Sequence, residues 1–462
     1  MTSPKNPLFR KAQRIHFVGI GGSGMSGIAE VLLNLNFTVT GSDLSSTPVT
    51  ERLRELGIHV SYTHAPGNIA GADVLVTSSA VKRDNPEVVE ARLRKVPVIP
   101  RAEMLSELMR MKYGVAIAGS HGKTSTTSMV AQVLSGAGMD PTIIIGGRLN
   151  ILGSSAKVGR GEFMVAEADE SDGSFLRLAP TIAVVTSISE EHLDHYGTME
   201  SLVNAFVGFL NKVPFYGAGV VCLDDPHIRE IMPRLTRPQL TYGLESQADL
   251  VGTRIEMNEF HSRFEVIFRG RWLGDVHLNV PGRHSISNAL AAILVGLEFD
   301  IKFDEIAEHL GHFSGADRRF QLRGVAGDIM VVDDYGHHPV EIRATLAAAR
   351  EAGKRRIVVV FQPHRYSRVR ALAEQFTRSF DQADVLIVTP IYRAGEKPIP
   401  GVTGEALAQA IKRNGHGDTS YANDFDEATR LLRRKARRGD LVITLGAGDV
   451  WKVAEAFLKD AG

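Results

Sequence analysis

The fold of this chain is decided first by residues 15–26, whose sequence is IHFVGIGGSGMS. An apolar run from Ile15 to Val18 enters a glycine-rich turn, and Met25 to Leu35 then repeats apolar residues at helical spacing. A strand that passes through G-x-G-x-x-G into a helix is typical of nucleotide-binding α/β domains, because the glycines let the backbone approach a pyrophosphate. The predicted contacts to such a ligand are Gly19, Gly21, Gly22, Ser23, Gly24, Met25 and Ser26.

The nucleotide itself is left open by this motif. Asp43 closes the next strand, where a carboxylate can bond a ribose hydroxyl. NAD is the simplest ligand for this pattern, another nucleotide diphosphate fits it equally, and glycines that serve only helix–strand packing are the structural alternative.

Strands and helices alternate along most of the remaining chain, which predicts parallel sheets covered by helices. We expect three domains: a Rossmann-like domain over residues 1–108, a central P-loop ATPase-like domain over 109–322, and a Rossmann-like C-terminal domain over 323–462. The central domain should hold a parallel sheet and a small antiparallel one, because residues 253–280 alternate polar and apolar side chains. The expected strands of the parallel sheets are 15–20, 37–40, 74–77, 96–99, 113–118, 163–166, 182–186, 329–332, 357–361, 385–388 and 441–445.

Composition excludes several classes of protein. Lysine plus arginine and aspartate plus glutamate both number 53 of 462 residues, so no general attraction to nucleic acid or an anionic membrane is expected. The single cysteine, Cys222, excludes an intrachain disulfide and a cysteine-based zinc site. No apolar run approaches the ~18 residues that a membrane-spanning helix needs, so we expect a cytoplasmic protein without membrane insertion.

A second glycine loop follows the strand expected at 113–118. Its shortened G-x-x-G-K-T pattern opens a helix, which predicts an ATP site in which Lys123 reaches the β- and γ-phosphates and Thr124 holds Mg²⁺. The residues of this predicted site are Gly119, Ser120, His121, Gly122, Lys123, Thr124 and Ser125.

Two polar segments follow neighbouring strands. Residues 167–172 (EADESD) carry four carboxylates, which suit Mg²⁺ but also suit a solvated acidic turn. His192, after the strand at 182–186, either ligates a second cation, orients a phosphate, or is simply hydrogen-bonded.

Taken in order, these motifs resemble the Mur ligase family, the ATP-dependent amide ligases of peptidoglycan precursor synthesis, over nearly the whole chain. The segments that carry the resemblance are 19–26, 119–124, 167–172, 190–197, PGRHSISNALAA at 281–292, GADRRFQ at 315–321, DDYGHHP at 333–339 and FQPHRYSR at 361–368. The resemblance implies a ligase that joins L-alanine to UDP-N-acetylmuramate.

The resemblance implies a role for each matching residue. The first loop would bind UDP-N-acetylmuramate, with Asp43 near the uridine, instead of NAD. ATP and Mg²⁺ are the implied cofactors. Lys123, His192, Arg319 and His337 are the implied catalytic residues; Asn288 and Arg319 would contact ATP; Thr124, Glu167 and His192 would bind the metal; His337, Arg365 and Arg368 would hold the amino acid.

The implied reaction has a physical rationale. A carboxylate does not acylate an amine at neutral pH, so ATP first converts it into an acyl phosphate, which the amine then attacks. Mg²⁺, lysine and arginine stabilise the charge that gathers during phosphoryl transfer, and His337 or His338 can accept the proton of the amine. We expect the domains to close about segments near 108 and 322, because closure keeps water from the acyl phosphate.

Three alternatives remain open from the sequence. A recycling ligase of the same family would attach a whole tripeptide instead of one amino acid. An NAD-dependent oxidoreductase would use only the first loop and leaves GSHGKT at 119–124 unexplained. A non-catalytic module that senses UDP-sugar would have no use for the acids beside the ATP loop.

Overall fold

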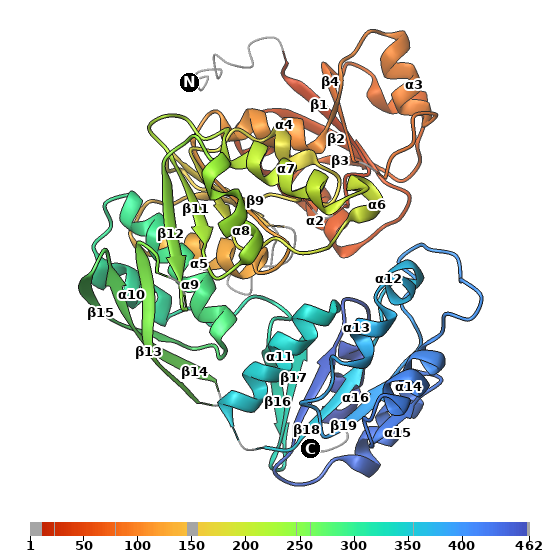
Figure 1. The fold of residues 1–462 in the computed structure, drawn as a ribbon. Coiled ribbons are helices and arrows are strands. Elements are labelled where there is room, and N and C mark those ends of the chain that lie inside the picture. Colours follow the sequence, from red (N-terminus) through yellow and green to blue (C-terminus); the bar gives the residue numbers. More distant parts are fainter. Residues whose placement is uncertain are drawn as a thin grey trace. The chain divides into compact units, whose positions relative to one another are not determined.

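The structure, a computed structural model (Figure 1), describes residues 12–459 except 23, 79, 146–155, 246, 259 and 354. The predicted Ser23 contact therefore lies outside the described residues. The described residues form three β-sheets, and the chain divides into two compact units. The first unit comprises residues 1–251, 266–274 and 287–310, and the second comprises 252–265, 275–286 and 311–462.

The first sheet has five parallel strands in the order β3-β2-β1-β4-β5, as predicted for a Rossmann-like domain. Its central strand β1 is buried: the apolar side chains Ile15, Phe17 and Val18 are at most 1% exposed. The chain winds outward from β1 in one direction and resumes at β4 on the other side, which creates a crevice at the carboxyl ends of β1 and β4. The elements are β1 (Arg14–Val18), α1 (Met25–Asn34), β2 (Thr38–Ser42), α2 (Pro48–Glu55), β3 (His59–Ser61), η2 (Pro66–Ile69), β4 (Val74–Thr77), α3 (Pro86–Leu93), β5 (Val98–Pro100) and α4 (Arg101–Met109).

The second sheet has ten strands in the order β15-β14-β13-β12-β11-β10-β6-β9-β7-β8. Its central strands are parallel and buried, and β13 begins beside β12 with Leu250 opposite Tyr242. The antiparallel strands predicted within 253–280 therefore extend this sheet instead of forming a separate one. Strands β14 and β15 join through the two-residue turn Arg269–Gly270, which reverses the chain.

The strands of this sheet are β6 (Tyr113–Ala118), β7 (Thr142–Ile144), β8 (Ala156–Lys157), β9 (Phe163–Glu167), β10 (Ile182–Val185), β11 (Ala218–Cys222), β12 (Gln239–Gly243), β13 (Leu250–Asn258), β14 (His261–Phe268) and β15 (Arg271–Leu278). The accompanying helices are α5 (Lys123–Gly136), η3 (Ser174–Arg177), α6 (Leu193–Tyr196), α7 (Met199–Leu210), α8 (Pro226–Ile231), η4 (Met232–Arg234), α9 (Arg283–Glu298) and α10 (Phe303–Gly311).

The third sheet has six strands in the order β16-β17-β21-β18-β19-β20, parallel except for the edge strand β16. Apolar side chains cover both of its faces, as parallel sheets require. Its elements are β16 (Gln321–Ala326), β17 (Ile329–Asp334), α11 (Pro339–Ala352), β18 (Ile357–Phe361), α12 (Tyr366–Ala371), α13 (Ala373–Thr377), β19 (Val385–Val388), α14 (Gly404–Arg413), β20 (Thr419–Tyr421), α15 (Phe425–Lys435), β21 (Leu441–Leu445) and α16 (Trp451–Lys459).

Both glycine loops lie at strand-to-helix turns, as the sequence predicts. Gly24 precedes α1 with φ of 78°, and Gly122 precedes α5 with φ of 81°. A side chain at these left-handed positions would strain the backbone, so glycine is required where each helix presents its first N–H groups.

Among the described residues, no helix is long and apolar enough to cross a membrane.

Candidate active site

The first glycine loop is tied to the end of β2. Gly19 and Ile20 donate their N–H groups to the Ser42 carbonyl at 2.8 and 3.0 Å. The Asp43 carboxylate accepts from the N–H of Gly21 at 2.9 Å and from that of Leu44 at 2.8 Å. Asp43 therefore shapes the loop itself, and its expected place beside the uridine stays a prediction.

Two predicted contacts of this loop are turned inward. The side chains of Met25 and Ser26 are at most 3% exposed. Their N–H groups donate to the Gly22 carbonyl at 3.0 and 3.3 Å. These residues start α1 and support the loop, so any direct ligand contact from them would have to compete with these bonds.

The second loop holds Lys123 in a fixed position. Its Nζ donates to the carbonyl of Gly119 at 2.6 Å and to that of Ser120 at 3.4 Å, and lies 2.7 Å from Glu170 Oε1. The side chain is only 16% exposed. A buried ammonium at the start of a helix is suited to bind phosphate oxygens.

The same loop is fastened to the segment that precedes His192. Ser120 N donates to the Ser187 carbonyl at 2.9 Å, and Ser189 N donates to Ser120 Oγ at 2.8 Å. His121 Nε2 lies 3.0 Å from Ser189 Oγ, so this histidine is part of the fastening and not a freely solvated group.

The predicted metal-binding residues fall into two neighbouring groups. Thr124 Oγ1 lies 3.2 and 3.3 Å from the two carboxylate oxygens of Glu167. His192, with a left-handed φ of 57°, places Nε2 3.7 Å from Glu170 Oε1, and ligand atoms of Glu170, Glu191 and His192 all lie within 4.8 Å of one another. Hard oxygen donors and an imidazole are thus gathered beside the second loop, as a divalent cation requires.

Glu170 and Glu191 are the residues of this group that the sequence did not single out, and Glu170 is the buried one. Its carboxylate is 1% exposed, and burial raises its pKa to about 7 even though Lys123 opposes the shift. The signal was present, because Glu170 lies in the acidic run at 167–172, but sequence spacing does not say which of four carboxylates turns toward Lys123.

Asn288, the predicted adenine contact, lies against the second loop. A Cβ atom on Gly122 would be 2.6 Å from Asn288 Oδ1, so the amide sits directly on the glycine. Ser285, in the same helix, donates its hydroxyl to the Pro281 carbonyl at 2.8 Å.

The remaining predicted site residues belong to the second unit. Arg319 Nη1 lies 3.5 Å from Glu341 Oε1, and Glu341 Oε2 accepts from His337 N at 3.0 Å. His337 Nδ1 lies 3.0 Å from the Tyr335 carbonyl, which can only accept, so Nδ1 carries a proton and donates it to that carbonyl. Glu341 therefore links two predicted catalytic residues, a role that the sequence left unassigned.

His338 has a different position from His337. It is 3% exposed and precedes α11, where its Nδ1 accepts from Val340 N at 3.4 Å. This is a helix-capping contact, and the assignment of His337 or His338 as the proton acceptor stays a prediction.

Arg365 and Arg368 follow His364, Arg365 as the N-cap of α12 and Arg368 within that helix, and the segment is tied to residues 392–396. Arg368 Nη1 lies 3.5 Å from His364 Nδ1, and Arg365 N donates to the Tyr392 carbonyl at 2.9 Å. His364 stacks on Tyr392 with ring centroids 5.4 Å apart. Burial, with His337 and the two arginines beside it, lowers the pKa of His364 to about 3, so its imidazole stays neutral and can accept from Arg368.

Comparisons with known proteins identify the family of the chain. Residues 14–113 match the model of the Mur ligase family, catalytic domain; residues 117–296 match the Mur ligase middle domain; and residues 318–448 match the Mur ligase, glutamate ligase domain. The chain is 56% identical to a UDP-N-acetylmuramate–L-alanine ligase of Trichlorobacter lovleyi over 98% of this chain and 100% of that one. It is 55% identical to the ligase of the same name from Geobacter sulfurreducens over 98% of both chains.

A solved structure shows the same similarity. The UDP-N-acetylmuramate–alanine ligase MurC of Thermotoga maritima is 28% identical, covers 97% of this chain and 98% of its own, and superposes with a TM-score of 0.80. Three family models match successive parts of the chain, and relatives are more than half identical to it along its whole length. The chain therefore belongs to the Mur ligase family and has that family's three-domain α/β fold.

Proposed function

We propose that this protein is the ATP-dependent ligase that joins L-alanine to UDP-N-acetylmuramate in peptidoglycan precursor synthesis. The products are UDP-N-acetylmuramoyl-L-alanine, ADP and phosphate. The observation that carries the proposal is the 56% identity, along the full length, to ligases that bear this name. Two glycine loops followed by a set of cationic and acidic side chains supply the parts that such a reaction needs.

The residues of the second loop carry out the first chemical step, which is phosphoryl transfer from ATP. Lys123 binds the terminal phosphates of ATP and withdraws charge from the transferred group, and Asn288 contacts the adenine. Thr124 and Glu167 suit Mg²⁺, because their oxygens already lie 3.2 and 3.3 Å apart, and His192 is a further donor. When bound, Mg²⁺ would neutralise phosphate charge. Transfer of the γ-phosphoryl group to the substrate carboxylate gives an acyl phosphate, which is a good acylating agent.

The second step falls to the residues of the C-terminal domain. Arg365 and Arg368 bind the carboxylate of the amino acid, and His337 Nε2 accepts a proton from its ammonium group. The neutral amine attacks the carbonyl carbon of the acyl phosphate, the C–N bond forms as the C–O bond to phosphate breaks, and the departing phosphate takes up the second proton of the amine. Arg319 stabilises the phosphate charge, and Glu341 fixes both Arg319 and His337.

The three domains extend, in this proposal, over residues 1–108, 109–322 and 323–462. They close about the segments near 108 and 322 during turnover. ATP and a nucleotide-activated sugar as substrates support a cytoplasmic location, in line with a single cysteine in 462 residues.

Two alternatives lose support. Membership of the Mur ligase family accounts for both glycine loops, whereas an NAD-dependent oxidoreductase would account for one. A peptide-adding ligase of the same family is disfavoured by the names of the relatives at 54–56% identity.

The test is an ADP-release assay with UDP-N-acetylmuramate and a panel of amino acids, with the tripeptide of peptidoglycan as the competing acceptor. We expect release that needs both co-substrates and is fastest with L-alanine. Faster turnover with the tripeptide would overturn the choice of acceptor, and release without UDP-N-acetylmuramate would overturn the proposed function.

A further inference from the structure

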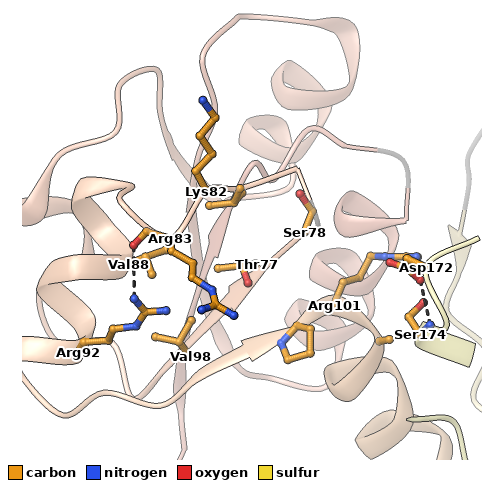
Figure 2. Close-up of a pocket in the computed structure, with 13 residues that line it drawn as sticks. Thr77, Ser78, Lys82, Arg83, Val88, Arg92, Val98, Arg101, Asp172 and Ser174 are labelled. Carbon is orange, nitrogen blue, oxygen red and sulfur yellow. Dashed lines mark hydrogen bonds between the residues drawn. The ribbon is translucent and has the colours of Figure 1, made fainter. Parts of the chain in front are cut away.

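A buried carboxylate of the first unit takes no part in the two chemical steps. Glu87 lies in the first turn of α3, and its side chain is 0% exposed. The next residue, Val88, lines a cavity of about 410 Å³ together with Thr77 and Val98 (Figure 2). Glu87 is not one of the residues that line this cavity, and its contacts show that the carboxylate is turned toward β1 and β2 instead.

The Glu87 carboxylate accepts hydrogen bonds from two other segments of the domain. Oε2 accepts from the hydroxyl of Ser42, the last residue of β2, at 2.6 Å. Oε1 accepts from Asn68 Nδ2 at 2.5 Å and from Ala65 N at 3.4 Å. One side chain thereby joins α3 to the end of β2 and to the segment that follows β3.

Two histidines border the same carboxylate. His16 Nε2, from β1, lies 3.6 Å from Glu87 Oε2, and His64 Nδ1 lies 3.5 Å from that oxygen. Both rings are fixed by hydroxyl groups of β2, because His16 Nδ1 lies 2.7 Å from Thr40 Oγ1 and His64 Nδ1 lies 3.0 Å from Ser42 Oγ. The carboxylate is therefore the centre of a polar network among apolar strands.

The network keeps Glu87 ionised at neutral pH. Burial acts to raise the pKa of this carboxyl, but the neighbouring His16 and the hydrogen bonds from Ser42 and Asn68 hold the pKa below its ordinary 4.5. Burying an ionised group is costly, and an apolar side chain of similar volume would attach α3 to the sheet at least as well. Attachment of α3 alone therefore does not account for a carboxylate at this position.

Ser42 connects Glu87 to the first glycine loop. The Ser42 carbonyl accepts the N–H groups of Gly19 and Ile20 at 2.8 and 3.0 Å, while its hydroxyl donates to Glu87. The next residue, Asp43, accepts a third N–H group of the loop at 2.9 Å. A shift of the end of β2 would therefore move the loop whose free N–H groups face a phosphate.

We propose that Glu87 is a positioning residue for the nucleotide half of the substrate, and that it acts through Ser42 on the first glycine loop. The inference rests on the proposed function and deepens it, since it names the side chain that fixes the loop for UDP. Glu87 does not touch the ligand in this scheme. Its loss should weaken nucleotide binding at the first loop and leave ATP binding at the second loop unchanged.

The first test compares Glu87→Ala and Glu87→Gln with the unmodified protein by calorimetry with UDP and with UDP-N-acetylmuramate. We expect Kd for both ligands to rise about tenfold or more in Glu87→Ala, and less in Glu87→Gln, which keeps an acceptor for Asn68. In the ADP-release assay, KM for UDP-N-acetylmuramate should rise in parallel. KM for ATP and kcat should stay within about twofold, because the lost interaction stabilises ground state and transition state alike.

The matched control is Leu53→Ala. Leu53 lies on α2 of the same domain, is 0% exposed, and has an apolar side chain that cannot bond to Glu87. This substitution leaves a cavity in the core and should lower the melting temperature without raising KM for UDP-N-acetylmuramate. A purely structural Glu87 would behave in the same way, so KM and Kd values in both Glu87 variants equal to those of Leu53→Ala would overturn the proposal.

The second test asks whether Glu87 acts through Ser42. Ser42→Ala removes the hydroxyl and keeps the carbonyl that holds the glycine loop, so it should raise Kd for UDP about as much as Glu87→Gln. The double variant should bind UDP no more weakly than either single variant, and additive losses would overturn the route through Ser42. An unmodified protein that binds neither UDP nor UDP-N-acetylmuramate would refute the proposed function instead, so the two failures are distinguishable.

Discussion

Two adjacent arginines, Arg318 and Arg319, should have opposite consequences when each is replaced by alanine. Arg318 is tied into the third sheet: Nε lies 2.8 Å from Asp333 Oδ2, Nη2 donates to the Gly446 carbonyl at 2.6 Å, and Nη1 donates to the Gly448 carbonyl at 3.0 Å. Arg319 is 30% exposed and lies 3.5 Å from a Glu341 oxygen. We expect Arg318→Ala to reduce stability and Arg319→Ala to reduce turnover.

The size of the stability loss follows from the burial of Asp333. This carboxylate is 0% exposed, and burial already raises its pKa above the ordinary 3.8 although Arg318 opposes the shift. Removing the partner of a buried pair costs about 3–5 kcal/mol, since an uncompensated charge remains. A loosely held, partly exposed pair such as Arg319–Glu341 contributes about 1 kcal/mol or less.

The sign of the pH dependence is also fixed. Without Arg318, the pKa of Asp333 in the folded protein rises further above 3.8. The contribution of this carboxyl group to the free energy of unfolding is then fully retained below pH 3.8. It is lost as the pH rises, at up to about 1.4 kcal/mol per pH unit. The Arg318→Ala defect should therefore be larger at pH 7 than at pH 5.

Urea unfolding followed by tryptophan fluorescence measures this difference. Of the two tryptophans, Trp451 starts α16, which packs on the third sheet, while Trp272 is exposed on β15. A Trp272→Phe background makes the signal specific for the C-terminal domain. Equal unfolding midpoints of the two alanine variants, or full ADP release by Arg319→Ala, would refute the distinction.

Four further predictions concern the same sites. Lys123→Ala should lower ADP release at least about a thousandfold, yet fold, because Glu170 with a pKa of about 7 can take up a proton; retained activity would exclude the loop assignment. Glu167→Gln should raise the Mg²⁺ concentration for half-maximal rate at least about tenfold, and an unchanged Mg²⁺ titration would remove Glu167 from the metal site. Asn288→Ala should raise KM for ATP several-fold and leave KM for UDP-N-acetylmuramate unchanged; the reverse pattern contradicts its adenine contact. Burial lowers the pKa of His364 to about 3 from 6.5, so stability should be full above pH 6.5 and fall as pH decreases toward 3, and urea midpoints at pH 7.5 and 5 should lie closer together in His364→Gln than in the unmodified protein.

Much of the fold follows from local sequence signals. The strands expected at 74–77, 113–118, 357–361, 385–388 and 441–445 have those exact bounds in the structure, because short apolar runs that end at glycine or polar residues are buried in parallel sheets. The first strand begins and ends slightly earlier than the expected 15–20, since Gly19 takes a left-handed φ and Ile20 joins the turn. Local patterning therefore specifies the elements but not how the antiparallel strands join the central sheet.

The candidate site follows from sequence only where its contacts are local. Gly122 is the N-cap of α5 and Thr124 lies in the first turn of that helix, so the motif and the geometry coincide. Glu341 is four residues beyond His337, on the first turn of α11, and an i,i+4 relation could have indicated it. Glu170 is 47 residues from Lys123, and no spacing rule specifies that pairing.

Arg318 and Arg319 also show that sequence predicts local contacts and does not predict distant ones. Arg318 bonds carbonyls 128 and 130 residues away, after β21 has entered the sheet beside β17, so its structural role exists only once the C-terminal domain is assembled. Its neighbour has the same charge and differs by one position along the chain. Because the Arg318 guanidinium is already committed to Asp333 and the two carbonyls, it could bind a phosphate only by abandoning a buried carboxylate. The Arg319 side chain is 30% exposed and its ion pair with Glu341 is longer, at 3.5 Å. This difference is the physical reason to expect the catalytic charge at Arg319 and not at Arg318.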